Sequence, residues 1–470
     1  MPRAISILMR GALGSYQQGH QLNALDAGLR EPVALVFMDD AHLEEGVPCN
    51  FKGVIPACQV SPLVKYTEYC AARGLFVHKR LAELGASPGF LILGLFGNPT
   101  NWFGADGTGC PSLASCIPDL RELLDRHKRL QILVDYSWEG ALGDEFFPGF
   151  DTFVRDLGVA PNRVVVLVSN EGIEDRYARY LRESRRSPAD WYRVIGDDLW
   201  LMYSAVELRQ KHWYAHPESL VRESEVDDAR HRIRQRKFLS FNRRPRWHRF
   251  LLALMIGRLG LESDGFVSMS SSRYQGDWAS EDERVAGFGA SMDPSVWSEL
   301  SGVKDRVYAT LPWNLDINME QNSGQPELYL FATQSRDLFL QSYTQIITES
   351  YMEGDCADVF ITEKTCRAIA NLQPFLVFGH AGTLRRFRKH GFEPVPFFDG
   401  GYDEALNLGH RLTKLYQCLA DLQASSIRDL HERYYAVFDI LRFNRERLFQ
   451  MPTILAASVA TRLRRELWVR

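Results

Sequence analysis

The sequence contains no uninterrupted apolar run of about 18 residues, the length that a membrane-spanning helix requires. The longest candidate, Phe250 to Leu261, is short and is interrupted by Arg258. The N-terminus, Met1 to Arg10, lacks the apolar stretch of a secretory signal and is typical of a first buried strand. We therefore predict no transmembrane segment and leave peripheral contact with a membrane open.

Excess charge of either sign is also missing. The chain has 55 Lys and Arg against 59 Asp and Glu, which gives a formal net charge of −4. A nucleic-acid-coating protein needs a basic surface, so this balance argues against a nucleic-acid partner. No Gly-x-x-x-x-Gly-Lys-Ser/Thr and no Gly-x-Gly-x-x-Gly occurs, which disfavours P-loop nucleotide hydrolases and dehydrogenases.

Cysteine patterns that bind metal or exchange disulfides are absent too. None of the eight cysteines forms Cys-x-x-Cys, and none lies at zinc-finger spacing from a histidine. We interpret them as reduced core or loop thiols, although disulfides are not excluded by the sequence. They are Cys49, Cys58, Cys70, Cys110, Cys116, Cys356, Cys366 and Cys418.

What the chain does have is length and alternation. At 470 residues it is too long for one ordinary core, so two domains of roughly 200 residues each are expected. Its first half alternates short, continuous apolar runs with helical patterns, which is typical of parallel strands covered by helices. Predicted strands are Ala4–Met9, Val33–Met38, Phe90–Leu95, Leu130–Val134 and Val164–Val168, and predicted helices are Val64–Leu84, Ile117–His127 and Ile173–Ser184.

The second half begins after a highly charged stretch, residues 217–236, which we interpret as a linker or surface helix. A strand is predicted at Lys237–Phe241 and a helix from Trp247 to Leu259. Residues 268–313 are rich in Ser, Gly, Asp and Trp with weak periodicity, and we expect them to form loops over a cleft. Helices are expected from residue 404 to the end of the chain.

A basic segment follows the predicted strand Lys237–Phe241 directly. Arginines in this position, at a strand end that leads into a helix, can make bidentate contacts with a diphosphate. The alternative is a solvated basic turn with no ligand. The candidate binding residues here are Asn242, Arg243, Arg244, Arg246 and His248.

A second segment, Val359 to Gly379, has the order apolar run, Thr-Glu-Lys, small-residue helix, Pro, apolar strand and Gly. It places the Glu363 carboxylate and the Lys364 ammonium at a helix N-terminus, where unpaired N–H groups suit a diphosphate or sugar hydroxyls. The alternative for Glu363 is a helix residue that favours the dipole and binds nothing.

The order and spacing of these residues resemble the donor-binding motif of α1,3-fucosyltransferases and related glycosyltransferases with two Rossmann-like domains, the GT-B type. The resemblance implies that Thr362, Glu363 and Lys364 bind a sugar nucleotide, together with the backbone at Gly379. It also aligns Glu349 and Ser350 with a Glu-Asn pair of the family, and here Ser350 departs from the pattern.

The implied fold class is α/β, with two Rossmann-like domains of the GT-B type, a cleft between them and a C-terminal helical segment. On this model residues 1–225 bind the acceptor, residues 237–440 bind the donor, and residues 441–470 form a helix that crosses back to the first domain. Fucosyltransferases of the Golgi type have a membrane anchor and a stem. Because this chain has neither, we expect a cytoplasmic protein.

Transfer of a sugar needs a general base to deprotonate the acceptor, and in this fold class it usually comes from the first domain. A carboxylate at a strand end can act in this way if burial raises its pKa towards the working pH. Glu139 is the first candidate, Asp135 the second and Asp40 the third, and helix capping is the alternative role for each.

No Asp-x-Asp occurs, so the metal-binding motif of the other large glycosyltransferase fold is missing. This favours metal-independent transfer without a separate cofactor. The expected donor is a sugar nucleotide such as GDP-fucose, and the expected acceptor is a glycan, lipopolysaccharide or protein. The rival functions are a non-catalytic carbohydrate- or nucleotide-binding module and another α/β enzyme that acts on phosphorylated ligands. The sequence leaves the sugar, the acceptor, the anomeric outcome and the oligomeric state open.

Overall fold

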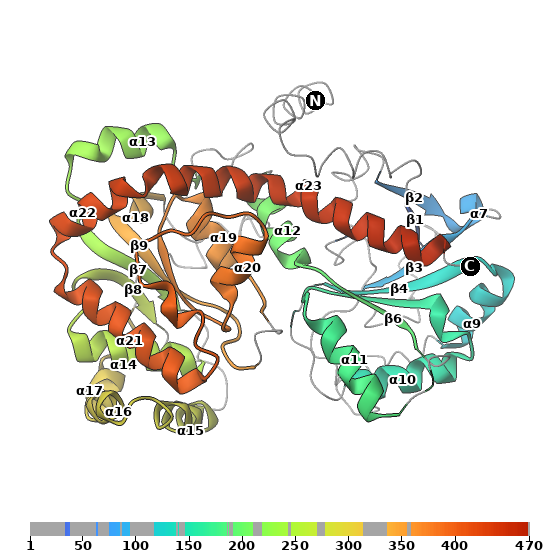
Figure 1. The fold of residues 1–470 in the computed structure, drawn as a ribbon, viewed down its shortest axis with the longest axis horizontal. Coiled ribbons are helices and arrows are strands. Elements are labelled where there is room, and N and C mark those ends of the chain that lie inside the picture. Colours follow the sequence, from blue (N-terminus) through green and yellow to red (C-terminus); the bar gives the residue numbers. More distant parts are fainter. Residues whose placement is uncertain are drawn as a thin grey trace.

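The computed structural model describes two α/β units, each built on its own parallel sheet (Figure 1). Each sheet is covered by helices, and the last helix of the chain runs over both units. The fold class of two Rossmann-like domains with a C-terminal helical segment is therefore confirmed, whereas the predicted domain limits stay a prediction. The described residues are 33–37, 63, 75–84, 87–94, 117–137, 140, 146–185, 187, 191–209, 219–242, 246–269, 278–313, 336–354 and 359–468.

The first sheet has six described strands in the order β2-β1-β3-β4-β5-β6, and every neighbouring pair is parallel. Four predicted strands are confirmed, and the predicted strand Ala4–Met9 lies outside the described residues. The strands are β1 (Val33–Phe37), β2 (Phe76–Arg80), β3 (Gly89–Gly94), β4 (Leu130–Tyr136), β5 (Val164–Val168) and β6 (Arg193–Gly196).

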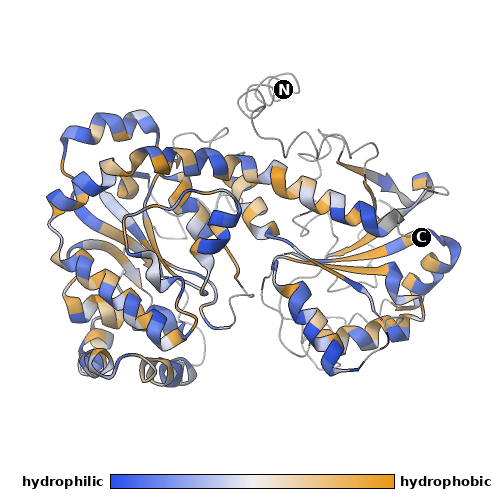
Figure 2. Ribbon diagram, in the orientation of Figure 1, coloured by the Kyte–Doolittle hydropathy of each residue, from blue (hydrophilic) through white to orange (hydrophobic). Residues whose placement is uncertain are grey.

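These strands read as continuous apolar runs because both faces of the sheet are buried. Leu133 and Val165 point into one hydrophobic cluster, while their neighbours Val134 and Val166 point into another on the opposite face. Figure 2 shows the central strands as hydrophobic along their length. One face is covered by α9 (Ile117–Arg126), α10 (Phe146–Leu157) and α11 (Ile173–Glu183).

The second sheet has four described strands in the order β10-β9-β7-β8, again all parallel. The chain leaves β7 towards β8 and then returns to the other side of β7 to form β9, so the strand order reverses between β7 and β9. The strands are β7 (Arg236–Asn242), β8 (Gly265–Met269), β9 (Ser342–Thr348) and β10 (Phe375–Phe378).

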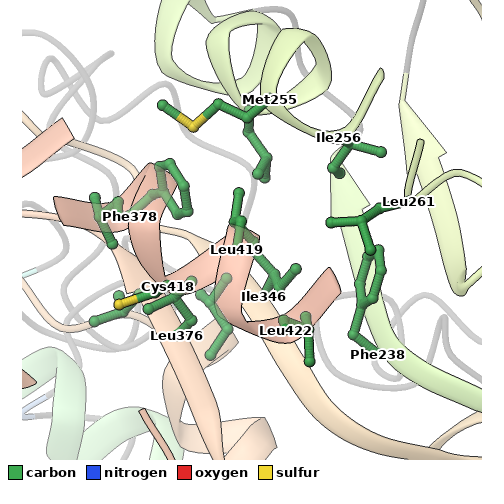
Figure 3. Close-up of a cluster of buried hydrophobic side chains, with 14 of the residues drawn as sticks. Phe238, Met255, Ile256, Leu261, Ile346, Leu376, Phe378, Cys418, Leu419 and Leu422 are labelled. Carbon is green, nitrogen blue, oxygen red and sulfur yellow. The ribbon is translucent and has the colours of Figure 1, made fainter. Parts of the chain in front are cut away.

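The helix α14 (Trp247–Leu259) has the predicted limits and is apolar on nearly every side. Residues 247–257 are all buried, as expected for a helix without a polar face. Figure 3 shows Met255 and Ile256 of this helix above Ile346 and Leu376 of the sheet, with Leu419 of α21 (Leu408–Ala424) between the layers.

Two predictions about local structure are wrong. Within the predicted helix Val64–Leu84, residues 76–80 form the strand β2, which pairs with β1, and α7 (Leu81–Leu84) follows it. The expected loops over 268–313 contain three helices, because the apolar surface of α14 needs cover on its outer side. Asp293 followed by Pro294 is a helix-start signal that the weak periodicity concealed. The helices are α15 (Trp278–Gly289), α16 (Pro294–Ser301) and α17 (Lys304–Thr310).

The helices expected after residue 404 are present, and the last of them spans both units. Figure 1 shows α23 (Phe438–Trp468) crossing from the second sheet to the first. Near its end, Arg462 Nη1 donates to the carbonyl of Gly196 at 2.6 Å, and the carbonyl of Glu466 accepts from Gln131 Nε2 at 3.2 Å. The described part of the chain contains no helix that is long and apolar enough to cross a membrane.

A single hydrophobic cluster joins the two units. It contains side chains from the first sheet, from α12 (Leu199–Glu207), from α19 (Glu363–Ala370) and from α23. All nine residues of α12 are buried, since this helix lies between its own sheet and the second unit. We call this contact of α12, α19 and α23 the seam.

A polar cluster lies beside the seam. Asp198, which follows β6, accepts a hydrogen bond from His390 Nε2 and lies 3.3 Å from Arg386 Nη1. The same Arg386 nitrogen is 2.6 Å from Glu171 Oε2, and Lys389 also pairs with Glu171. The two carboxylates belong to the first unit and the three cationic or titratable groups follow β10 in the second, so the cluster joins the units electrostatically.

The neighbouring aspartates Asp197 and Asp198 have opposite pKa shifts. Burial, together with the charge of Asp198, raises the pKa of Asp197 from 3.8 to about 6, although Ser458 Oγ donates to it at 2.8 Å. Burial alone would also raise the pKa of Asp198, but the hydrogen bond from His390 and the charge of Arg386 outweigh burial and lower it.

These shifts predict opposite effects of the two Asp→Asn changes on stability. A depressed pKa means that the ionised Asp198 stabilises the fold above its unfolded pKa, so Asp198→Asn should cost roughly 2–3 kcal/mol at pH 7.5. A raised pKa means that Asp197 favours the fold only while protonated, and this contribution is lost as the pH rises through about 6. Asp197→Asn should therefore raise the melting temperature at pH 7.5, with an upper limit of about 3 kcal/mol.

The measurement is thermal unfolding of both variants between pH 4 and pH 7.5. The advantage of Asp197→Asn over the wild type should shrink as the pH falls from about 6 and vanish near 3.8, the ordinary pKa of the carboxyl group. An equal loss of melting temperature in both variants at pH 7.5 would contradict the account.

Candidate functional site

The candidate site lies at the reversal of strand order in the second sheet. Asn242 is the last residue of β7, and Thr348 is the last residue of the neighbouring strand β9. Thr348 Oγ1 donates to Asn242 Oδ1 at 2.5 Å, so the two strand ends are tied together. In open parallel sheets, ligands bind outside the carboxyl ends of the strands at such a reversal.

The basic segment reaches from β7 across to the end of β9. Arg246 donates to the carbonyl of Ser350 and lies over the ring of Tyr351, with the guanidinium carbon 5.4 Å from the centroid. Arg249 Nε donates to Thr348 Oγ1 at 3.1 Å. Of the predicted residues, Arg243 and Arg244 lie outside the described part of the chain.

His248 is buried and holds the chain after β9. Its Nε2 atom is 3.0 Å from the carbonyl oxygen of Glu349, so Nε2 carries the proton and donates. Burial, with the charges of Arg249 and Arg246, lowers the pKa of His248 well below its usual value. The imidazole is therefore neutral at physiological pH and fixes the backbone at Glu349 rather than offering a charge.

Glu349 is fully buried, and its carboxylate is taken up by the start of α19. One oxygen accepts from the backbone N–H of Thr362 at 3.2 Å and from the hydroxyl of Thr365, and the other accepts from the hydroxyl of Thr362. Instead of pointing at a ligand, Glu349 thus orients the loop that presents Glu363 and Lys364. Its predicted direct contact with the donor is not supported by this geometry.

The helix N-termini at this edge of the sheet already hold protein carboxylates. Trp247 N of α14 donates to Glu281 Oε2, and the first N–H groups of α20 (Thr383–Lys389) donate to Asp403. At α19 the N-cap Thr362 accepts from Lys364 N at 3.3 Å. The N–H groups of Thr362 and Lys364 are thus engaged within the protein, and the binding of a diphosphate at this helix N-terminus stays a prediction.

Glu363 and Lys364 form a partly exposed ion pair at the start of α19. Lys364 Nζ donates to Glu363 Oε1 at 2.8 Å and to Thr362 Oγ1 at 3.1 Å. Their side chains are 14% and 24% exposed, so both are accessible to a ligand. Burial acts to raise the pKa of Glu363, but the Lys364 ammonium more than compensates and lowers it, so Glu363 is ionised at neutral pH.

Gly379 directly follows β10. A Cβ at this position would lie 3.4 Å from Glu349 Cγ and 3.4 Å from Thr383 Oγ1, which is ordinary contact distance. The structure therefore places Gly379 against the side chain of Glu349.

Of the three candidates for the general base, the structure describes only Asp135. Asp135 is fully buried in β4, where one oxygen accepts from the N–H of Ser137 at 3.0 Å and from its hydroxyl. Glu139 and Asp40 lie outside the described residues. Gly140, which follows Glu139 in the sequence, lies against the Phe360 ring of the second unit, two residues before Thr362.

Sequence reasoning missed Trp200, whose indole N–H donates to Glu363 Oε2 at 3.2 Å. Trp200 belongs to α12 of the first unit, so the site combines groups from both units. A tryptophan in a mostly apolar helix gives no sequence signal for such a contact, because only the docking of α12 on α19 brings the two side chains together.

No protein-family model and no curated protein matches the chain. Among solved structures, the chain is similar to α,α-trehalose 6-phosphate synthase from Burkholderia multivorans (10% identity, 85% of this chain and 78% of that chain, TM-score 0.35). It is also similar to the UDP-forming synthase from Burkholderia xenovorans (9% identity, 85% and 80%, TM-score 0.36) and to trehalose-6-phosphate synthase OtsA (10% identity, 91% and 99%, TM-score 0.36). A likeness of this degree carries no argument about function, which rests on the site.

The role of Glu349 can be tested by a neighbouring pair of substitutions. Glu349→Gln keeps the volume but removes one acceptor oxygen and the charge, so we expect a loss of about 1–3 kcal/mol in unfolding free energy. Ser350→Ala is the control, because the bond that Ser350 accepts from Arg246 at this site goes to its backbone carbonyl, which the substitution keeps. Chemical denaturation of both variants measures the difference, and equal stability of the two would contradict the orienting role.

Proposed function

We propose that the chain is a glycosyltransferase that moves a sugar from a sugar nucleotide to a carbohydrate-containing acceptor. The observation that carries the proposal is the Glu363–Lys364 pair, held by Glu349 beside the reversal of strand order in the second sheet. The resemblance of this segment to the fucosyltransferase motif supports the same reading and suggests a GDP-sugar, with GDP-fucose as the first choice.

The charges at this edge suit the leaving group of such a reaction. When the glycosidic bond to the nucleotide breaks, negative charge develops on the diphosphate, and cationic side chains stabilise it. Lys364 has three N–H donors, and two of them are directed at Glu363 and Thr362. The third is available to a phosphate oxygen, while the lone pairs of Glu363 that Lys364 and Trp200 leave unused can accept from sugar hydroxyls.

The general base is proposed to come from the first unit. Glu139 remains the first candidate, because the adjacent Gly140 lies against Phe360 at the seam. Asp135 is a weaker candidate in the structure, since its carboxylate is buried and engaged with Ser137. An inverting, metal-independent transfer is the form of the proposal that the lack of Asp-x-Asp in the sequence supports.

A panel of sugar nucleotides in a thermal-shift assay tests the donor. GDP-, UDP- and dTDP-sugars are compared with ATP and with free monosaccharides. Stabilisation by one class of sugar nucleotide supports the proposal, and stabilisation by ATP or a simple phosphorylated metabolite alone favours another α/β enzyme. Hydrolysis or transfer of the bound donor in the presence of EDTA then separates a metal-independent enzyme from a non-catalytic binding module.

Lys364→Ala should weaken binding of the sugar nucleotide by roughly 1.5–3 kcal/mol, because a charge-assisted hydrogen bond to the diphosphate is lost. Isothermal titration calorimetry measures the change. The control is Lys304→Ala, which removes another lysine that is paired with a carboxylate, Asp282, on α15. Equal affinity in the wild type and Lys364→Ala would refute the assignment.

Glu139→Gln should lower turnover by about 100-fold or more, the usual scale for loss of a general base, with donor affinity retained. The retained affinity follows because Glu139 belongs to the unit that does not hold the donor. Asp135→Asn and Asp40→Asn rank the alternatives in the same assay. Near-normal turnover of Glu139→Gln would exclude Glu139 as the base, and a loss of donor affinity would place it in the donor site.

A further inference from the structure

Trp200 is anchored in the first unit. Its backbone N–H donates to Ser169 Oγ at 2.6 Å, directly after β5, and its ring stacks on Tyr203 with centroids 4.7 Å apart. The side chain is almost fully buried within α12. Packing and backbone together therefore fix the direction of the indole N–H from the side of the first sheet.

The same ring contacts the second unit in two ways. It packs against Phe360, two residues before the N-cap of α19, at a centroid distance of 6.2 Å. Its Nε1 donates to Glu363 Oε2 at 3.2 Å, while Glu363 Oε1 accepts from Lys364 Nζ at 2.8 Å. The Glu363 carboxylate is thus held by one donor from each unit, one on each oxygen.

The two donors together fix the orientation of the Glu363 carboxylate. An indole nitrogen is only a donor, so it can hold an acceptor oxygen but cannot exchange roles with it. With Oε2 held by Trp200, the plane of the carboxylate is set, and with it the side on which Lys364 meets Oε1. Loss of the indole N–H would leave Glu363 free to rotate towards Lys364 and compete with a phosphate for the ammonium.

We propose that Trp200 is a positioning residue of the donor site, which orients Glu363, and through it Lys364, for a sugar nucleotide. The inference rests on the proposed function. It means that the donor-binding groups of the second unit take up their geometry only when the first unit is docked at the seam. Donor affinity then depends on contacts between the units as well as on groups that touch the donor.

The test is a double-mutant cycle between Trp200→Phe and Glu363→Gln, read as the affinity for GDP-fucose, or for the sugar nucleotide that stabilises the wild type most. Trp200→Phe should lower the affinity of the wild-type background about tenfold, the effect of one hydrogen bond to a charged group. In the Glu363→Gln background the same change should have less than about a twofold effect, because the group it acts through is altered. Trp313→Phe is the control, since it removes another indole bond, to Thr310 Oγ1 at 3.1 Å, outside the site.

The outcomes distinguish a failure of the positioning role of Trp200 from a failure of the proposed function. A tenfold loss in both backgrounds, or no loss in either, overturns the positioning role while the proposed function stands. A wild type that binds no sugar nucleotide overturns the proposed function and this inference with it. If Trp200→Phe does not fold, a benzothiophene analogue of tryptophan at position 200 keeps the ring shape without the N–H, and the same cycle decides.

Discussion

The burial of α12 between the two units is the interaction on which the rest of the structure depends. Every residue of this helix is buried, and its apolar sides contact its own sheet, α19 and α23 in one continuous core. A helix that is apolar on nearly every side is stable only when it is covered all round. The second unit and the C-terminal helix supply that cover, so the two sheets are held as one packed assembly.

The site is a consequence of this packing. Docking of α12 on α19 brings Trp200 to Glu363, and the polar cluster of Asp198, Glu171, Arg386, Lys389 and His390 joins the units beside it. Buried carboxylates, chiefly Glu349 and Asp403, occupy helix N-termini at the same edge. Several N–H groups at these helix ends are thus bonded within the protein, and on the proposed function the side chains of Lys364 and Glu363 meet the sugar nucleotide.

Much of the fold could be predicted from the sequence, because the continuous apolar run Val164–Val168 and the predominantly apolar helix Trp247–Leu259 indicate burial by their composition. The strand Phe76–Arg80 could not be predicted, because Lys79 and Arg80 break the apolar pattern of a buried strand. Only its pairing with β1 makes this segment extended. For the candidate site, the spacing along the chain pointed to the Thr-Glu-Lys segment, whose binding role stays a prediction, but not to the bonds of Glu349 or the contact with Trp200. Both depend on which hydrogen-bond partners the tertiary fold brings within reach, and spacing along the chain does not encode that.

The most direct test of the account is a crystal structure of the protein with the sugar nucleotide that stabilises it most. The account predicts the diphosphate at the reversal of strand order between β7 and β9, with Lys364 Nζ in contact with a phosphate oxygen and Glu363 facing the sugar. A nucleotide bound at the first sheet, or anywhere out of reach of Lys364, would contradict it.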